Sequence, residues 1–121
     1  MDERRTARVS EAVREELSEI IGFEMDDPRV TAADVTDVQV SADGRYATVK
    51  VGVRGDENEQ RRSLAALEHA KAFLRHELAT RLALRHVPEL HFVLDRYPDS
   101  ESRVELLLKR ARKTRGRDEG A

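Results

Sequence analysis

The sequence has 121 residues, of which 39% are hydrophobic and 38% are charged, so it can build one core but is too short for two. It has no cysteine, which excludes disulfides, thiolate catalysis and most structural zinc sites. The net charge of −2 hides an asymmetry, because residues 1–60 carry 8 Arg or Lys against 15 Asp or Glu, whereas residues 61–121 carry 14 against 9. Charge alone leaves two interpretations open: solvated faces, or an arranged basic patch for a polyanion.

The first predicted element is an α-helix over about 6–23, where apolar residues recur at helical spacing. These residues are Val9, Ala12, Val13, Leu17, Ile20 and Ile21. Gly22 marks the expected end of the helix, and Asp26-Asp27-Pro28 breaks the pattern. Adjacent acids before a proline commonly form turns, so we interpret Asp26 and Asp27 as a turn and not as a carboxylate pair for metal or acid-base chemistry.

A β-hairpin is predicted next. Its two β-rich runs contain Val35, Val38 and Val40, then Tyr46, Thr48, Val49 and Val51. Between them, the segment 41–44 ends in Asp-Gly, which can take the positive φ that a tight turn requires. We therefore expect 35–41 and 45–53 to pair antiparallel.

One or two helices are predicted after the hairpin, because 56–59 places acidic charge at a helix start and neither Pro nor Gly follows before Pro88. An apolar stripe runs through this segment at Leu64, Leu67, Leu74, Leu78 and Leu82. Lys71 interrupts the stripe, flanked by Ala70 and Ala72. Either Lys71 lays its methylenes on the core of one helix and keeps its ammonium in water, or two helices meet near the alanines.

The C-terminal part is predicted to add a short strand after Pro88 and a final helix over 100–112. We expect 1–112 to form a single domain and the basic segment 113–121 to be a disordered tail. The order helix, strand, strand, helix, helix, strand predicts an α+β fold in which helices cover one face of a three-stranded sheet. This order matches the type II K-homology RNA-binding fold, with a C-terminal helical extension.

K-homology domains clamp nucleic acid with a GXXG loop between two helices. The match Gly52-Val53-Arg54-Gly55 follows the second predicted strand instead, so we interpret it as a strand end and a loop. The sequence does resemble the ribosome-binding factor A family, bacterial maturation factors of the small ribosomal subunit, over about 4–111. The resemblance is carried, in order, by RTARV at 5–9, DPRV at 27–30, VTDVQVSADGRYATVKV at 35–51 and FLRHELATRLALRHVPELHFVLD at 73–95.

The resemblance implies a K-homology-like domain in which an interhelical kink, usually Ala-x-Gly, replaces the GXXG loop. Ala70, Lys71 and Ala72 occupy the kink position here, without the glycine. The resemblance also implies a factor that binds free or immature small (30S) subunits, contacts small-subunit rRNA, supports late processing of 16S rRNA and leaves the mature subunit. We expect no cofactor, and a monomer when free.

Basic side chains supply the candidate RNA contacts. Lys71 and Arg75 are four residues apart, as are Arg81 and Arg85, so each pair is predicted to project from one helical face toward phosphates. The predicted RNA-binding residues are Arg4, Arg5, Arg8, His69, Lys71, Arg75, Arg81 and Arg85. Several alternatives stay open: ion pairs of Arg75 or Arg81 with Glu77 or Glu89, neutral surface histidines at 69 and 76, a frayed helix start at the N-terminal arginines, and loose electrostatic contact by 109–117.

Catalysis finds no support in the sequence. His76-Glu77 begins a zinc-protease HExxH motif, but Thr80 stands where the second histidine is required. No nucleophile elbow, Walker loop or dinucleotide motif is present, so we expect neither an enzyme nor a metal site. Nothing resembles a signal peptide or a membrane span, which predicts a cytoplasmic protein that does not associate with membranes. The alternative function is a protein-protein adaptor that uses a sheet edge or the first helix.

Overall fold

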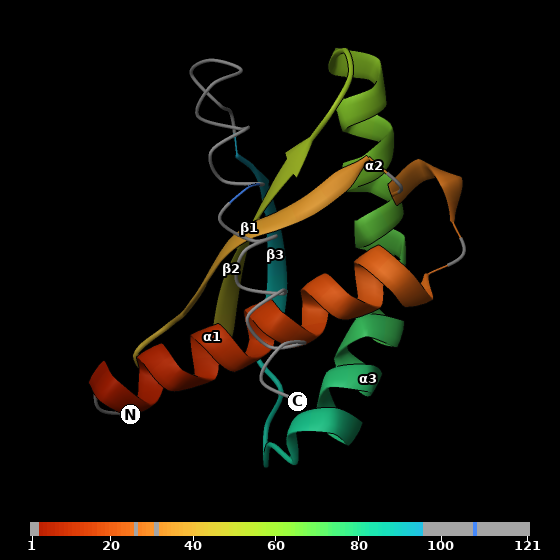
Figure 1. The fold of residues 1–121 in the computed structure, drawn as a ribbon. Coiled ribbons are helices and arrows are strands. Elements are labelled where there is room, and N and C mark those ends of the chain that lie inside the picture. The colour runs from red at the N-terminus through yellow and green to blue at the C-terminus, as the bar shows by residue number, and fades with distance from the viewer. Residues whose placement is uncertain (1–2, 26, 31, 96–107, 109–121) are drawn as a thin grey trace.

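The computed structural model describes residues 3–25, 27–30, 32–95 and 108 (Figure 1). Its elements are α1 (Glu3–Glu19), η1 (Ile20–Glu24), η2 (Pro28–Val30), β1 (Ala33–Val40), β2 (Tyr46–Val53), α2 (Glu57–His69), α3 (Lys71–Leu82) and β3 (Glu89–Leu94). This order confirms the predicted α+β fold of K-homology type. The predicted helix over 100–112, apart from the helical and exposed Leu108, and the predicted tail over 113–121 lie outside the described residues.

The predicted hairpin is confirmed. β1 and β2 pair antiparallel, with Val40 opposite Ala47, and the backbone N–H of Ser41 donates to the carbonyl of Tyr46 at 2.8 Å. Gly44 closes the turn at φ 76°, a conformation that favours glycine. The Ser41 hydroxyl donates to the Asp43 carboxylate, and this hydrogen bond lowers the pKa of Asp43. The turn therefore forms from the residues that predicted it.

A β-bulge in β1 was not predicted. The register shifts between Val35 and Asp37, which leaves Thr36 as the extra residue. Its hydroxyl lies 2.6 Å from an Asp95 carboxylate oxygen and 3.2 Å from the carbonyl of Lys50. The bulge thus ties the end of β3 to β1 across the intervening strand.

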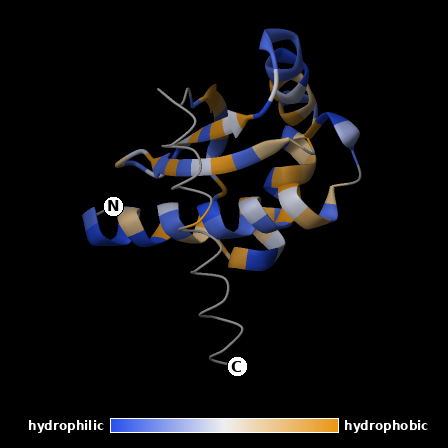
Figure 2. Cartoon of the chain, turned by 45° about the horizontal axis from the view of Figure 1, so that its top comes forward, coloured by the Kyte–Doolittle hydropathy of each residue, from blue (hydrophilic) through white to orange (hydrophobic). Residues whose placement is uncertain are grey.

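The sheet has the order β1-β2-β3, and β3 runs parallel to β2. Parallel neighbours need a crossover, which α2 and α3 provide. Along β2, Ala47, Val49 and Val51 are fully buried, whereas Tyr46 is 47% exposed. This alternation, visible along the strands in Figure 2, means that the helices cover one face of the sheet and leave the other open.

The core joins the inner face of the sheet to leucines, valines and isoleucines of the helices. Its largest fully buried side chains are Leu17, Ile20, Leu67, Leu74, Leu78, Leu90, Val13, Val30, Val35, Val49 and Val51. The predicted stripe after Asp56 supplies Leu67, Leu74 and Leu78 to this set, whereas Leu64 and Leu82 are half-buried. Helical spacing therefore identified the residues that hold α2 and α3 on the sheet.

The first helix ends differently from the prediction. α1 passes into the π-helical turn η1, where the N–H of Met25 donates to the carbonyl of Ile20 at 2.9 Å. We expected Gly22 to mark the end of the helix. It lies inside this π-helical turn instead. The wider turn lets two consecutive residues, Ile20 and Ile21, both enter the core at 0% and 4% exposure, while Phe23 is 87% exposed.

The segment after η1 supports a turn at Asp27. Its carboxylate accepts hydrogen bonds from the backbone N–H of Arg29 at 2.9 Å and from the Arg29 guanidinium. These bonds hold the pKa of Asp27 below its usual value. Asp26 lies outside the described residues. The carboxylate of Asp27 is thus used in local structure, as the sequence predicted for this pair.

Of the two alternatives for the segment after Asp56, the structure has two helices. Asp56 caps α2, because its side chain accepts from the N–H of Glu59 at 2.9 Å. Gly52 and Val53 belong to β2, and Gly55 lies in the loop that follows, so the GXXG match is the strand end and loop that we predicted. None of the described helices is long and apolar enough to cross a membrane.

Replacing Leu74 with alanine tests the core. Leu74 is fully buried in the first turns of α3, so the change should leave a cavity and lower the free energy of unfolding by about 2–5 kcal/mol. Urea denaturation followed by circular dichroism measures this loss. Phe73→Ala, at the half-exposed neighbouring position, is the matched control and should cost clearly less. Equal losses for the two variants would contradict the placement of α3.

Candidate nucleic-acid interface

The break between α2 and α3 lies at Ala70. Its N–H donates to the carbonyls of Ala66 and Leu67 at 3.0 and 3.1 Å, and its own carbonyl accepts the first hydrogen bond of α3, from Leu74 at 2.9 Å. Ala70 has φ −88° and ψ 1°. Because this φ is negative, an alanine adopts it readily, and Ala72 already lies within α3. α2 therefore ends and α3 begins without the glycine that the family pattern places here.

Lys71 and Arg75 lie one turn apart at the start of α3. The Lys71 ammonium is 2.7 Å from a Glu68 carboxylate oxygen, and the two side chains are 27% and 46% exposed. Arg75 is exposed and donates one N–H to the carbonyl of Val87 at 3.1 Å. Surface pairs of this kind contribute about 0–1 kcal/mol, and a guanidinium has five donors. Both cations can therefore turn to a phosphate at small cost. His69 and His76, which are close to Lys71 and Arg75 in the sequence, are also exposed.

Arg81 is engaged within the protein. Its guanidinium lies 2.5 Å from a carboxylate oxygen of Glu24, and 3.4 Å from oxygens of Glu16 and Glu77. The hydrogen bond to Glu24 and the surrounding negative charge raise the pKa of Arg81. These four residues, which we call the Arg81 cluster, join α1, η1 and α3. The open alternative of an ion pair with Glu77 is thus observed, together with two carboxylates that the sequence did not suggest.

The predicted pairing of Arg81 with Arg85 on one helical face is wrong. α3 ends at Leu82, and Ala83 takes the left-handed conformation with φ 49° and ψ 36°. Arg85 therefore lies beyond the helix, exposed in the loop before β3. No glycine marks this stop, so the helical pattern continued in the sequence past the point where the helix ends.

The N-terminal arginines lie on the first turns of α1. Arg4, Arg5 and Arg8 are all exposed. Two of them border a hollow of about 310 Å³ between α1 and the end of α3, which we call the α1–α3 slot. It is lined by Arg5, Arg8, Val9, Ala12, Leu82 and Leu84. The structure thus brings one predicted basic cluster beside the loop that carries Arg85.

The apolar residues of the α1–α3 slot were not predicted as site residues. Helical spacing placed Val9 and Ala12 on the core-facing side of the first helix; both are half-buried, and Val9 packs against the core. Only the termination of α3 brings Leu84 opposite them. The sequence contained their apolar character but no signal for this proximity.

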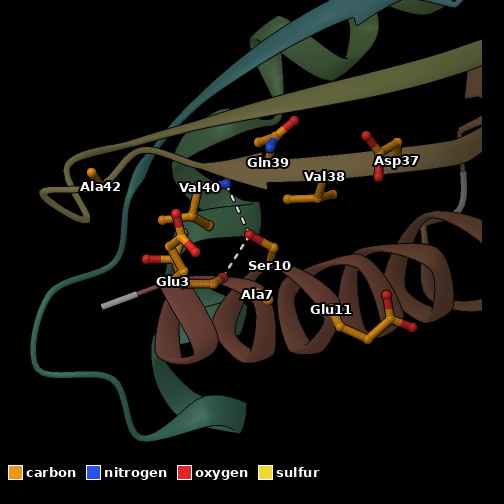
Figure 3. A pocket seen from close by; sticks show the side chains of 10 residues that line it. Glu3, Ala7, Ser10, Glu11, Asp37, Val38, Gln39, Val40 and Ala42 are labelled. Atoms are coloured by element: carbon orange, nitrogen blue, oxygen red, sulfur yellow. Dashed lines mark hydrogen bonds between the residues drawn. The ribbon is translucent and has the colours of Figure 1, made fainter. Parts of the chain in front are cut away.

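A larger hollow of about 660 Å³ lies on another side of α1, along β1 (Figure 3). Figure 3 shows Ser10 between the two elements: its hydroxyl accepts from the N–H of Val40 at 2.9 Å and donates to the carbonyl of Thr6 at 2.8 Å. The charged residues that line this hollow, among those the structure describes, are Glu3, Glu11 and Asp37. Carboxylates repel phosphate, so this hollow does not suit a nucleic acid despite its size.

The HExxH-like segment forms ordinary helix. The Thr80 hydroxyl donates to the carbonyl of His76 at 3.0 Å, one turn earlier in α3. Within the part of the chain that the structure describes, no group of three or more His, Asp or Glu side chains is placed to hold a metal ion.

Comparison with known proteins assigns the family. The family model described as ribosome-binding factor A matches residues 5–108. The ribosome-binding factor A of Solibacter usitatus is 68% identical over 98% of this chain and 97% of its own length. That of Thermomicrobium roseum is 43% identical over 97% of this chain and 91% of its own. The chain belongs to the ribosome-binding factor A family.

Solved structures of ribosome-binding factor A share the fold. The crystal structure of the Thermus thermophilus protein matches with a TM-score of 0.66 and 30% identity, over 74% of this chain and 93% of that one. A homology model of the Thermus thermophilus factor, fitted into a cryo-EM map of a 30S complex, matches with a TM-score of 0.59 and 29% identity, over 81% and 99% of the two chains. The family and the K-homology-like architecture therefore agree.

Replacing Arg81 with alanine should lower the thermal unfolding midpoint, because three carboxylates lose the cation that they share. Glu24→Gln should lower it less, since two carboxylates still hold Arg81. The double variant should lose less than the sum of the two single losses, because both changes remove one shared interaction. Arg61→Ala, at an exposed site on α2, is the control and should change little. Strictly additive losses would show that Arg81 and Glu24 do not interact in solution.

Proposed function

We propose that this protein binds free or immature small ribosomal subunits through their rRNA, supports the late processing of 16S rRNA, and leaves when the subunit is mature. Membership of the ribosome-binding factor A family supports this proposal, as does the likeness to a relative fitted into a 30S complex. The function is binding and not catalysis. The single observation that carries it is a set of cations at both ends of α3, where Arg75 and Arg85 are exposed and Lys71 is half-buried beside the exposed Glu68.

The proposed interface has two parts. One part is the break between α2 and α3, with His69, Lys71 and Arg75. The other is the end of α3 with Arg85, beside Arg5 and Arg8 of α1. Phosphate contacts at two places on one rigid surface select an RNA shape, because only a backbone with the matching spacing reaches both.

Charge segregates along α1 in a way that supports this orientation. Its first half carries Arg4, Arg5 and Arg8 against Glu3, whereas its second half carries Glu11, Glu15, Glu16 and Glu19 against Arg14. The acidic second half is held against Arg81 through Glu16. We propose that the arginine end of α1 faces RNA and the glutamate end faces away from it. The acidic first half of the sequence therefore contributes cations to the interface, which its net charge concealed.

The alternative, a protein-protein adaptor that uses the edge of β1 or the first helix, draws on the acidic hollow beside β1. A basic extended segment would complement its carboxylates. However, Ser10 already occupies the outward N–H of Val40, so strand addition at that point would need this bond to break. RNA binding accounts better for the exposed arginines, and salt dependence separates the two functions because counterion release is steep for nucleic acid.

Replacing both Lys71 and Arg75 with alanine should weaken binding to purified immature small subunits without unfolding the protein. Both sites are on a helix surface, and alanine is the best helix former. Each lost phosphate contact should reduce the slope of log affinity against log salt by about 0.9. Co-sedimentation at several salt concentrations measures both quantities, with thermal unfolding as a check and the double variant Arg61→Ala, Arg62→Ala, at exposed sites on α2, as the charge-matched control. A folded double variant with unchanged affinity and slope would remove this part of the interface.

A further inference from the structure

We propose that the α1–α3 slot holds a single unpaired RNA base, with the adjoining phosphate on Arg5 and Arg8. The inference rests on the proposed RNA-binding function and names the ligand of one part of that surface. It requires three properties of the slot: walls that suit a base, cations that suit its phosphate, and a backbone that keeps the walls in place.

The walls are apolar and preformed. Val9 and Ala12 line one side from α1, and Leu82 and Leu84 line the other from the end of α3, all of them half-buried. A base presents apolar faces to such walls while the polar groups at its edge stay in water. The volume of about 310 Å³ lies at the lower end of the range of roughly 300–1,000 Å³ for small-molecule pockets. The slot therefore suits one base and not a stack of several.

The charged residues that line the slot are both arginines. Arg5 and Arg8 are three residues apart, so they emerge from successive turns of α1 on neighbouring positions. A guanidinium binds phosphate oxygens through paired N–H donors. The acids Glu3 and Glu11 of the same part of α1 line the other hollow, beside β1. This helix therefore separates its charges by face, and the slot lies on the cationic face.

The backbone at the slot has an uncommon conformation. Ala83 lies between the two leucines of the wall and has φ 49°. Among the residues that the structure describes, it is the one non-glycine residue with a positive φ. L-residues with a side chain adopt this region rarely, and they keep it only where the surrounding structure holds it. It ends α3 abruptly and places both Leu82 and Leu84 against α1. The two leucine walls thus depend on one fixed turn.

Filling the slot separates base insertion from simple charge attraction. Ala12→Leu adds volume between the walls, leaves both arginines, and keeps a good helix former in α1. Affinity for a short unstructured RNA oligonucleotide, measured by fluorescence anisotropy, should fall about tenfold with an unchanged salt slope. Replacing Arg5 and Arg8 with alanine should instead reduce the slope by about 0.7 for each lost contact with a single strand. Arg61→Ala is the charge control, and thermal unfolding checks each variant.

Nuclear magnetic resonance of the unaltered chain provides a second measurement that depends on no variant. Adding the oligonucleotide should shift the methyl signals of Ala12, Leu82 and Leu84. If the oligonucleotide binds but these signals stay in place, the inference is overturned, even where Ala12→Leu fails to fold. The same conclusion follows if folded Ala12→Leu binds it as tightly as the unaltered protein.

The experiment also distinguishes the inference from the function on which it rests. If the unaltered protein fails to sediment with immature subunits, the proposed function fails and the inference fails with it. If it sediments and binds the oligonucleotide while the slot variants behave normally, the inference alone fails. If Ala12→Leu no longer binds subunits but still binds the oligonucleotide normally, the slot holds a protein side chain and an RNA base is excluded. If Ala12→Leu binds neither subunits nor the oligonucleotide, and the oligonucleotide shifts the methyl signals of the unaltered protein, the results support a base in the slot.

Discussion

The crossover between β2 and β3 must return the chain along one face of a sheet whose strands have eight and six residues. A straight helix over 57–82 would be about 39 Å long, whereas an eight-residue strand spans only about 27 Å. Such a helix would project beyond the sheet and leave part of its apolar stripe in water. The chain instead forms two shorter helices separated at Ala70, and Leu67 of α2 and Leu74 of α3 are both fully buried in the same core.

The candidate interface follows from that break and from the end of α3. At the break the leucine stripe is interrupted, and Lys71 is half-buried there while Arg75 is exposed, so the lysine need not be fully buried with its neighbours. The Arg81 cluster then fixes α1 and η1 to α3. This attachment positions the first turns of α1 beside Leu84 and so creates the α1–α3 slot. Core geometry and interface geometry are therefore set by the same helix crossing.

The sequence predicted the features that depend on local periodicity. The order of helices and strands, the turn at Gly44, the acidic helix start after Gly55 and the leucines of the core were all visible in short windows. It did not predict what depends on contacts between distant residues, such as the link from Thr36 to Asp95 or the partners of Arg81 that lie 57 and 65 positions away.

Helix termination was the other failure, and it affected the candidate site directly. The sequence predicted Arg85 on the same helix as Arg81, because the helical pattern continues through Leu82 and nothing at Arg85 indicates a helix end. A glycine at position 83 would have indicated the stop, since glycine is common in the left-handed conformation after a helix. Alanine in that conformation is held by its surroundings, which only the folded structure shows.

The basic side chains at the start and end of α3 differ in their neighbours and therefore in their chemical roles. Arg81 forms ion pairs with three carboxylates and its side chain is 23% exposed, so its charge stabilises the contact between helices. Lys71 has a single exposed carboxylate partner, and Arg75 uses one donor on a carbonyl. Exchanging a weak surface pair for a phosphate costs little in either direction, because each such pair contributes so little free energy. An interface built from cations of the second kind can form and dissociate without disturbing the core, as the proposed release from the mature subunit would require. The Arg81 cluster meanwhile ties α1 and η1 to α3 independently of any ligand.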